Sequence, residues 1–311
     1  MHREDDMKKL NVKINNIAEL VKNRNQQLLD HHMDKIDSIT VGDENPFKKI
    51  SNVKDKIDPE FNKEIEEVHL PISKNTQIPT PNVILRSALF GIVKKGNRKY
   101  EKNVLKATFN GYTVKYSGEQ LDQSDLDVWL ECLQRCQSTP LGKVVKFTPN
   151  DFLISIGRSN GKSDYVWLNE SLWRLRVNDV EISDGKYTYM GSLIFEQYRD
   201  EETTESCLIL NPKIVVCFDD SGWTGITKSV RLQLKGKPLT QWIHGFYSSH
   251  SKPVPIKVET IRELSGSSIK ELRMFRYRLK NALYELASVT GWNCYIDDAD
   301  KVIISKIAKK I

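Results

Sequence analysis

The sequence predicts an α+β fold that consists of two tandem winged-helix domains behind an N-terminal, partly helical and loosely ordered arm. Three observations support this prediction. The length of 311 residues suits two domains and a tail, at roughly 150 residues per domain. The element order helix, helix, turn, helix, β-hairpin is typical of a winged helix, and it occurs twice. Much of the net charge of +6 is concentrated in the third helix of the second occurrence.

Residues 1–80 differ in composition from the rest and are expected to form an arm and linker. Apolar residues recur there at heptad-like spacing: Met7, Leu10, Ile14, Ile17, Val21 and Leu28. This pattern predicts either a short coiled-coil arm or a solvated helix docked on its own domain, and both remain open. Five prolines among many charges between positions 46 and 81 predict a tether.

Residues 81–222 are predicted to form the first winged-helix domain. Asn82 suits the cap of a helix that includes Ala88 and Leu89, and Asn110-Gly111 breaks a hairpin over 104–116. Three helices follow over 122–137, 149–156 and 163–176, the second opened by Thr148. Strands over 180–183, 187–198 and 207–210 then provide the β-hairpin.

Residues 223–311 are predicted to form the second winged-helix domain. Its helices span 239–249, 258–264 and 267–289, with a turn at 266–268 before the third. A hairpin of 292–296 and 301–307 crosses an acidic tip at 297–300, which argues against that tip lying on phosphates.

The third helix of the second domain is the predicted DNA-reading element. Its leucines and Phe275 fall on one side, and its basic residues fall mostly on the other. A helix-turn-helix inserts the start of this helix into the major groove, where Arg273 suits guanine and the two serines suit a phosphate. The expected DNA-contacting residues are Ser267, Ser268, Lys270, Arg273, Met274, Arg276, Tyr277 and Lys280. Arg278 and Lys280 are expected on phosphates.

The first domain offers a weaker polar surface ahead of its third helix. Its residues are Arg158, Ser159, Asn160, Lys162 and Ser163. This surface predicts either a second DNA contact or a dimer interface, and the sequence does not choose between them.

Composition and spacing argue against catalysis, metals, cofactors and membranes. Five irregularly spaced cysteines form no C-x-x-C motif, which is typical of reduced thiols in a cytoplasmic protein. His31 and His32 are adjacent and would face opposite ways on a strand. Gly157 lies one residue too close to Gly161 for a phosphate-binding loop. No apolar run reaches the ~20 residues of a membrane span, and no signal peptide opens the chain.

Several short stretches appear in an order that resembles the TrfA-type plasmid replication initiators. They are 85–90 (LRSALF), 116–121 (YSGEQL), 140–142 (PLG), 250–255 (HSKPVP) and 264–267 (LSGS). The resemblance implies two winged helices that bind directly repeated sites (iterons) at a plasmid origin, aid origin opening and recruit host replication proteins such as the host initiator and the replicative helicase. It also implies a homodimer in equilibrium with DNA-active monomers. The clamp-binding element Gln-Leu-x-Leu-Phe of some members is absent, and Gln26-Gln27-Leu28-Leu29 replaces it poorly. A winged-helix transcriptional repressor or autoregulator on operator DNA is the alternative.

Overall fold

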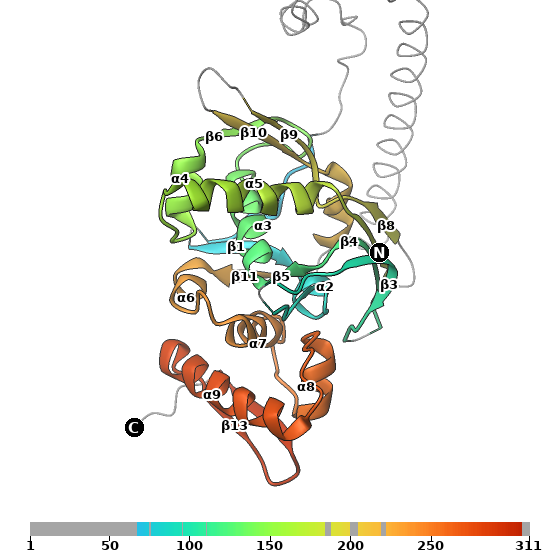
Figure 1. Cartoon of the computed structure of the whole chain (residues 1–311), viewed down its shortest axis with the longest axis vertical. Helices are drawn as coiled ribbons and strands as arrows, with labels where there is room; N and C mark the ends of the chain where they lie inside the picture. The colour runs from blue at the N-terminus through green and yellow to red at the C-terminus, as the bar shows by residue number, and fades with distance from the viewer. Residues whose placement is uncertain are drawn as a thin grey trace, which may run out of the picture. The chain divides into compact units, whose positions relative to one another are not determined.

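The computed structural model describes residues 67–306 except 75, 95, 110, 184–187, 200–204 and 219–221 (Figure 1). The chain divides into two units, Met1–Glu67 and Val68–Ile311. The predicted arm helix over residues 7–28 belongs to the first unit and lies outside the described residues. Within the described part, no helix has both the length and the apolar character of a membrane span.

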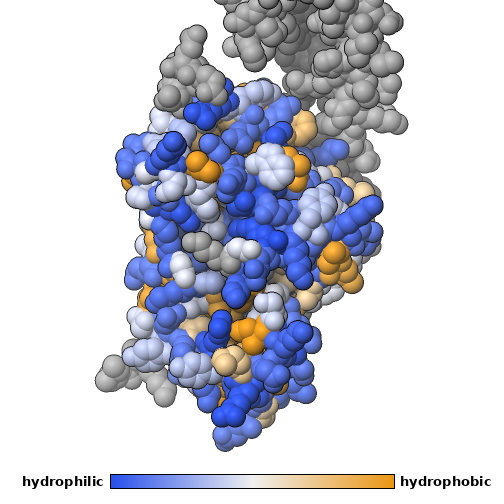
Figure 2. Space-filling model, viewed as in Figure 1, coloured by the Kyte–Doolittle hydropathy of each residue, from blue (hydrophilic) through white to orange (hydrophobic). Residues whose placement is uncertain are grey.

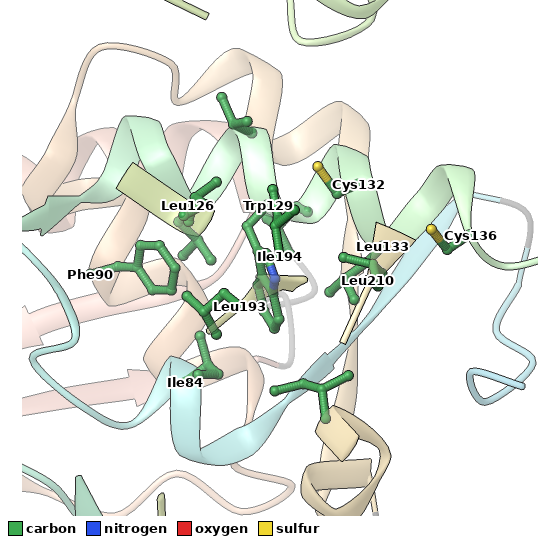
Figure 3. Close-up of a cluster of buried hydrophobic side chains, with 14 of the residues drawn as sticks. Ile84, Phe90, Leu126, Trp129, Cys132, Leu133, Cys136, Leu193, Ile194 and Leu210 are labelled. Carbon is green, nitrogen blue, oxygen red and sulfur yellow. The ribbon is translucent and has the colours of Figure 1, made fainter. Parts of the chain in front are cut away.

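The first hydrophobic core is built around helix α3 (Gln123–Arg135). Asp122 caps this helix by accepting from the backbone N–H groups of Ser124 and Asp125 at 2.8 and 3.1 Å. Asp125 accepts in return from the Asp122 N–H at 3.0 Å, which completes a capping box. The side chain of Trp129 is fully buried, and Phe90 stacks on it at 6.1 Å between ring centroids (Figure 3).

Helices α3, α4 (Pro149–Ser155) and α5 (Lys162–Arg176) form the first predicted three-helix array (Figure 1). Thr148 caps α4 and accepts from the Asp151 N–H at 3.2 Å, as expected from the sequence. The wing sheet is antiparallel, in the order β6 (Val145–Phe147), β10 (Ser206–Leu210), β9 (Ile194–Arg199). The first winged helix is thus confirmed, with β9 and β10 as its wing.

The predicted hairpin directly after α5 belongs to a different sheet. Strands β3 (Tyr100–Lys106), β4 (Thr113–Glu119), β7 (Asp179–Ser183) and β8 (Thr188–Gly191) form an antiparallel four-stranded sheet. The single strand expected over 187–198 is therefore wrong, because the chain leaves one sheet at Gly191 and enters the wing at Ile194. The hairpin expected over 104–116 is confirmed as β3 and β4.

Short elements join this core to the rest of the chain. Strand β1 (Gln77–Pro81) pairs antiparallel with β11 (Trp223–Thr227), and β2 (Phe90–Gly91) pairs parallel with β5 (Leu121–Asp122). The 3₁₀ helix η3 (Pro212–Phe218) follows β10. The tether expected up to position 81 is therefore wrong for β1, because Ile78 is buried and its strand is paired.

Helix α2 (Asn82–Leu85) is shorter than predicted. Asn82 is its first residue rather than its cap, and its side-chain oxygen accepts from the Thr224 hydroxyl at 2.7 Å. Ala88 and Leu89 lie beyond the helix, since the chain turns there toward β2.

The second winged helix has its own core, which includes helix α6 (Lys228–Gln233) at its edge through Val230 and the following Leu234. Its three helices are α7 (Pro238–Ser248), α8 (Val258–Leu264) and α9 (Leu272–Thr290). Its sheet has the order β12 (Ile256–Lys257), β14 (Lys301–Ser305), β13 (Asn293–Ile296). The predicted hairpin and helix order are confirmed, with Phe275, Leu279, Leu283 and Leu286 buried as expected.

Candidate nucleic-acid interface

The exposed side of α9 carries a stripe of cationic and aromatic side chains. Phe275 and Leu279 are fully buried, whereas Arg273, Tyr277 and Lys280 are exposed on the other side, as the helical pattern predicts. Tyr277 is 64% and Met274 51% exposed. On the face shown in Figure 2, mainly hydrophilic residues cover the part of the molecule that holds α9 and its wing in Figure 1.

The start of α9 differs from the prediction. The helix begins at Leu272, so Ser267, Ser268 and Lys270 lie in the connection between α8 and α9 rather than in the first helical turn. Gly266 ends α8 with φ of +64°, and the Arg262 guanidinium donates to the Lys270 carbonyl at 2.8 Å, which holds the connection away from helical geometry. The predicted helix start at Ser267 is therefore wrong, whereas contact of Ser267 and Ser268 with a phosphate stays a prediction. Ser268 and Lys270 are exposed beside the helix.

Glu271 takes the cap position of α9 without a side-chain hydrogen bond to the helix. The first N–H groups of a helix have no partners inside it, so they favour a negatively charged group. The start of α9 therefore lies at Leu272, five residues later than the sequence predicts.

Arg276 is held by the wing. Its Nε and Nη2 donate to the two carboxylate oxygens of Asp300 at 2.7 and 2.6 Å. The hydrogen bond from Arg276 holds the pKa of the Asp300 carboxyl below its ordinary value. The acidic tip therefore neutralises one of the predicted DNA-contacting cations and attaches the wing to α9.

The first winged helix presents a less basic surface at the start of α5. Arg158 lies over the Trp167 ring at 3.3 Å from its centre and pairs with Asp164 at 2.8 Å. Ser159 also bonds to Asp164, and these bonds hold the pKa of that carboxyl below its ordinary value. Asn160, Lys162 and Ser163 are exposed, so they are the members of this predicted set that are free to contact a partner at their surface.

The sequence reading missed part of the α9 stripe. Tyr284 is 78% exposed and lies seven residues beyond Tyr277, on the same side of α9 as Arg273 and Lys280. Tyr284 follows Lys280 by the same helical spacing of three and four residues that identified the rest of the stripe. The predicted set of DNA-contacting residues did not extend beyond Lys280.

Two cysteines and a histidine that could carry chemistry are buried. Cys132 and Cys136 are buried, and burial raises the pKa of the Cys136 thiol to about 12. His250 shares a 2.7 Å hydrogen bond with the Phe246 carbonyl. Among the described residues, no group of three or more His, Cys, Asp or Glu side chains is placed to hold a metal ion.

Two winged helices, one presenting a basic and aromatic third helix beside its wing, define the class of protein that reads DNA with helix-turn-helix elements. A family model described as "TrfA protein" matches residues 47–301, so the chain belongs to the TrfA family. A relative from Escherichia coli, "Plasmid replication initiator protein TrfA", is 26% identical over 223 residues. That match covers 68% of this chain but only 57% of the relative.

Two solved structures share the fold. The Pi initiator protein in complex with iteron DNA is 13% identical, with a TM-score of 0.51, and the likeness covers 75% of this chain and 97% of the other. Domains 2 and 3 of RctB are 11% identical, with a TM-score of 0.50 and coverage of 72% and 96%. The resemblance to the TrfA-type initiators and the tandem winged-helix fold class are both confirmed.

Proposed function

We propose that this protein initiates plasmid replication by binding directly repeated sites at the plasmid origin. The observation that carries the proposal is the α9 stripe beside the wing, in a chain of the TrfA family. The E. coli relative is described as a plasmid replication initiator, and the Pi initiator, of similar fold, was crystallised on iteron DNA.

In this proposal Arg273 and Tyr277 read base edges in the major groove, while Arg278 and Lys280 contact phosphates. Exposed Asn160, Lys162 and Ser163 provide a second, weaker contact from the first winged helix. The protein acts in the cytoplasm without catalysis. It aids origin opening and recruits the host initiator and the replicative helicase. Dimers dissociate to give the DNA-active monomer.

Footprinting on candidate origin DNA at a stated salt concentration tests this proposal, because salt dominates the affinity of protein–DNA contacts. We expect protection of several direct repeats beside an AT-rich tract. Protection of a single inverted repeat at a promoter would favour the repressor alternative and contradict initiation through iterons.

Footprints of variants with substitutions in the α9 stripe test whether α9 is the helix that reads the repeats. Arg273→Ala with Tyr277→Ala should abolish the protected repeats, whereas Tyr100→Ala, at an exposed position on β3, should leave them. Retention of the repeats by the stripe variant would contradict the assignment of α9 as the reading helix.

A further inference from the structure

Helix α6 packs with the second core, yet it contacts the first winged helix at the turn between α4 and α5. Lys235, just after α6, donates to the Gly157 carbonyl. Gly157 has φ of +68°, and a Cβ atom there would lie 3.3 Å from Leu232 Cδ2. Helix α6 also packs against α9, so it bridges the turn before α5 and the reading helix of the second winged helix.

The corresponding turn of the second winged helix, after α8, is contacted in the same way by a segment of the first winged helix. The Ile92 N–H donates to the Ser265 carbonyl at 2.9 Å, in the turn that follows α8. Gly266 has φ of +64°, and a Cβ atom there would lie 3.3 Å from Ala88 Cβ and 3.4 Å from Gly91 Cα. The neighbouring Phe90 is buried in the first core. Each turn is therefore fixed by a segment that belongs to the core of the other winged helix.

A buried charged cluster lies between the two winged helices. Arg231 is only 5% exposed and donates to Asp127 at 2.6 Å and to the Gln123 carbonyl at 3.0 Å, both on α3. It also donates to the Gln241 carbonyl on α7 at 3.2 Å. Lys228 pairs with Glu131 at 2.7 Å. Because a buried guanidinium is stable only with its partners in place, this cluster resists sliding of one winged helix over the other.

We propose that these contacts form a joint that fixes the separation of α5 and α9, and that the joint makes the spacing between two DNA contacts a determinant of site recognition. The inference rests on the proposed function, and specifically on DNA contact by both winged helices. It names Asp127, Arg231, Leu232 and Lys235 as positioning residues, none of which needs to touch DNA.

The physical reason is the geometry of linked binding. Two modules joined rigidly gain affinity only where both contacts can form at once. One inserted base pair displaces the second contact by about 3.4 Å and rotates it by about 34°, since a helical turn of B-DNA spans about 10.5 base pairs and 34–36 Å. A fixed joint therefore accepts one spacing, whereas a loose joint accepts several.

The test uses the full chain and duplexes made from the footprinted site. One, two or three base pairs are inserted between the segment protected through α9 and the segment protected through the start of α5. Affinity is measured on each duplex and on a random duplex at one salt concentration. Wild-type protein should lose about 10-fold or more of its affinity on inserted sites.

Two variants loosen the joint in different ways. Asp127→Ala with Arg231→Ala removes both charges of the buried pair, so that neither is left unpaired. Leu232→Ala with Lys235→Ala removes only the contact with the Gly157 turn and keeps the buried pair. Lys237→Ala is the matched control, because this lysine pairs with Glu285 inside the second winged helix at 3.3 Å. Circular dichroism checks that each variant is folded.

We expect both joint variants to bind the parent site more weakly than the wild type does. Insertions should lower the affinity of these variants by less than about a further 3-fold, whereas the control should show the wild-type loss of affinity on inserted sites. A wild-type protein that tolerates the insertions, or folded joint variants that keep the wild-type profile, would overturn the inference and leave the proposed function standing. Equal wild-type affinity for the site and the random duplex would overturn both.

Discussion

Arg276 of α9 and Asp300 of the wing turn form an ion pair with two hydrogen bonds, at 2.7 and 2.6 Å. The pair lies at the surface, and its two side chains are 33% and 39% exposed. Exposed pairs contribute little to stability, so its consequence is expected in binding, where it removes one cation from the reading helix.

Replacing Asp300 by Asn should release Arg276 and strengthen binding to random DNA. Each additional phosphate contact steepens the dependence of log affinity on log salt by about one. The measurement is a salt titration of binding to a random duplex. Asp298→Asn is the control, because Asp298 is exposed and its loss changes the charge equally without releasing Arg276. Identical salt slopes for the two variants would contradict a neutralising role for Asp300.

Replacing Arg273 by Ala should weaken binding to the specific site by about 1–3 kcal/mol and relax specificity at one base pair. The reason is that arginine gives guanine two hydrogen bonds that other bases do not match. Lys280→Ala is the comparison, and we expect it to weaken specific and random binding alike. Equal losses on both DNAs for Arg273→Ala would make Arg273 a phosphate contact.

Replacing Asp125 by Asn should destabilise the first winged helix by about 3–5 kcal/mol, because it removes the fully buried carboxylate that Arg174 and Arg98 share. Asp125 is fully buried and accepts from Arg174 Nη2 at 2.9 Å, Arg98 Nη1 at 2.8 Å and the Ser171 hydroxyl at 2.7 Å. Urea unfolding measures the change.

The control for this prediction is Asp151→Asn. Asp151 pairs with Arg135 at 2.8 Å, but its side chain is 65% exposed, so its loss should cost no more than about 1 kcal/mol. Similar losses of unfolding free energy for both variants would show that the buried Asp125 network contributes no more to stability than the exposed pair of Asp151 and Arg135.

Acidification should destabilise the second winged helix through His244. Burial, followed by the charges of Arg231 and Lys306, lowers the pKa of this imidazole to about 3. The unfolded chain then binds the extra proton between about pH 6.5 and pH 3, so stability falls as pH drops through that window. From pH 7 to pH 5 the expected loss is on the order of 2 kcal/mol.

Thermal or urea unfolding at several pH values measures this dependence. His244→Gln should flatten the curve between pH 7 and pH 5, because glutamine does not titrate. A variant curve parallel to that of the wild type would assign the acid sensitivity to other groups.

Periodicity and turn signals predicted most of the second winged helix. Helix α8 begins and ends where the sequence places it, and the alternation of Phe275 and Leu279 with Arg273 and Tyr277 identified the exposed side of α9. Such patterns succeed because a helix must bury one side, whatever its neighbours are.

Local signals failed in two places. Residues 267–270 suit a helix start, but Gly266 and the bond from Arg262 to the Lys270 carbonyl keep them outside α9. The proline-rich segment at 77–81 suits a tether, but it pairs with β11 almost 150 residues away, and no short window of sequence contains both strands.

The sequence by itself determined the two winged helices, their separate cores and the basic side of α9, because these follow from the periodic burial of apolar residues along each element. Only the tertiary structure decided that Asp300 pairs with Arg276 and that Arg231 joins the two winged helices through Asp127. These pairs depend on the meeting of side chains that lie 24 and 104 residues apart, which local pattern and propensity do not encode.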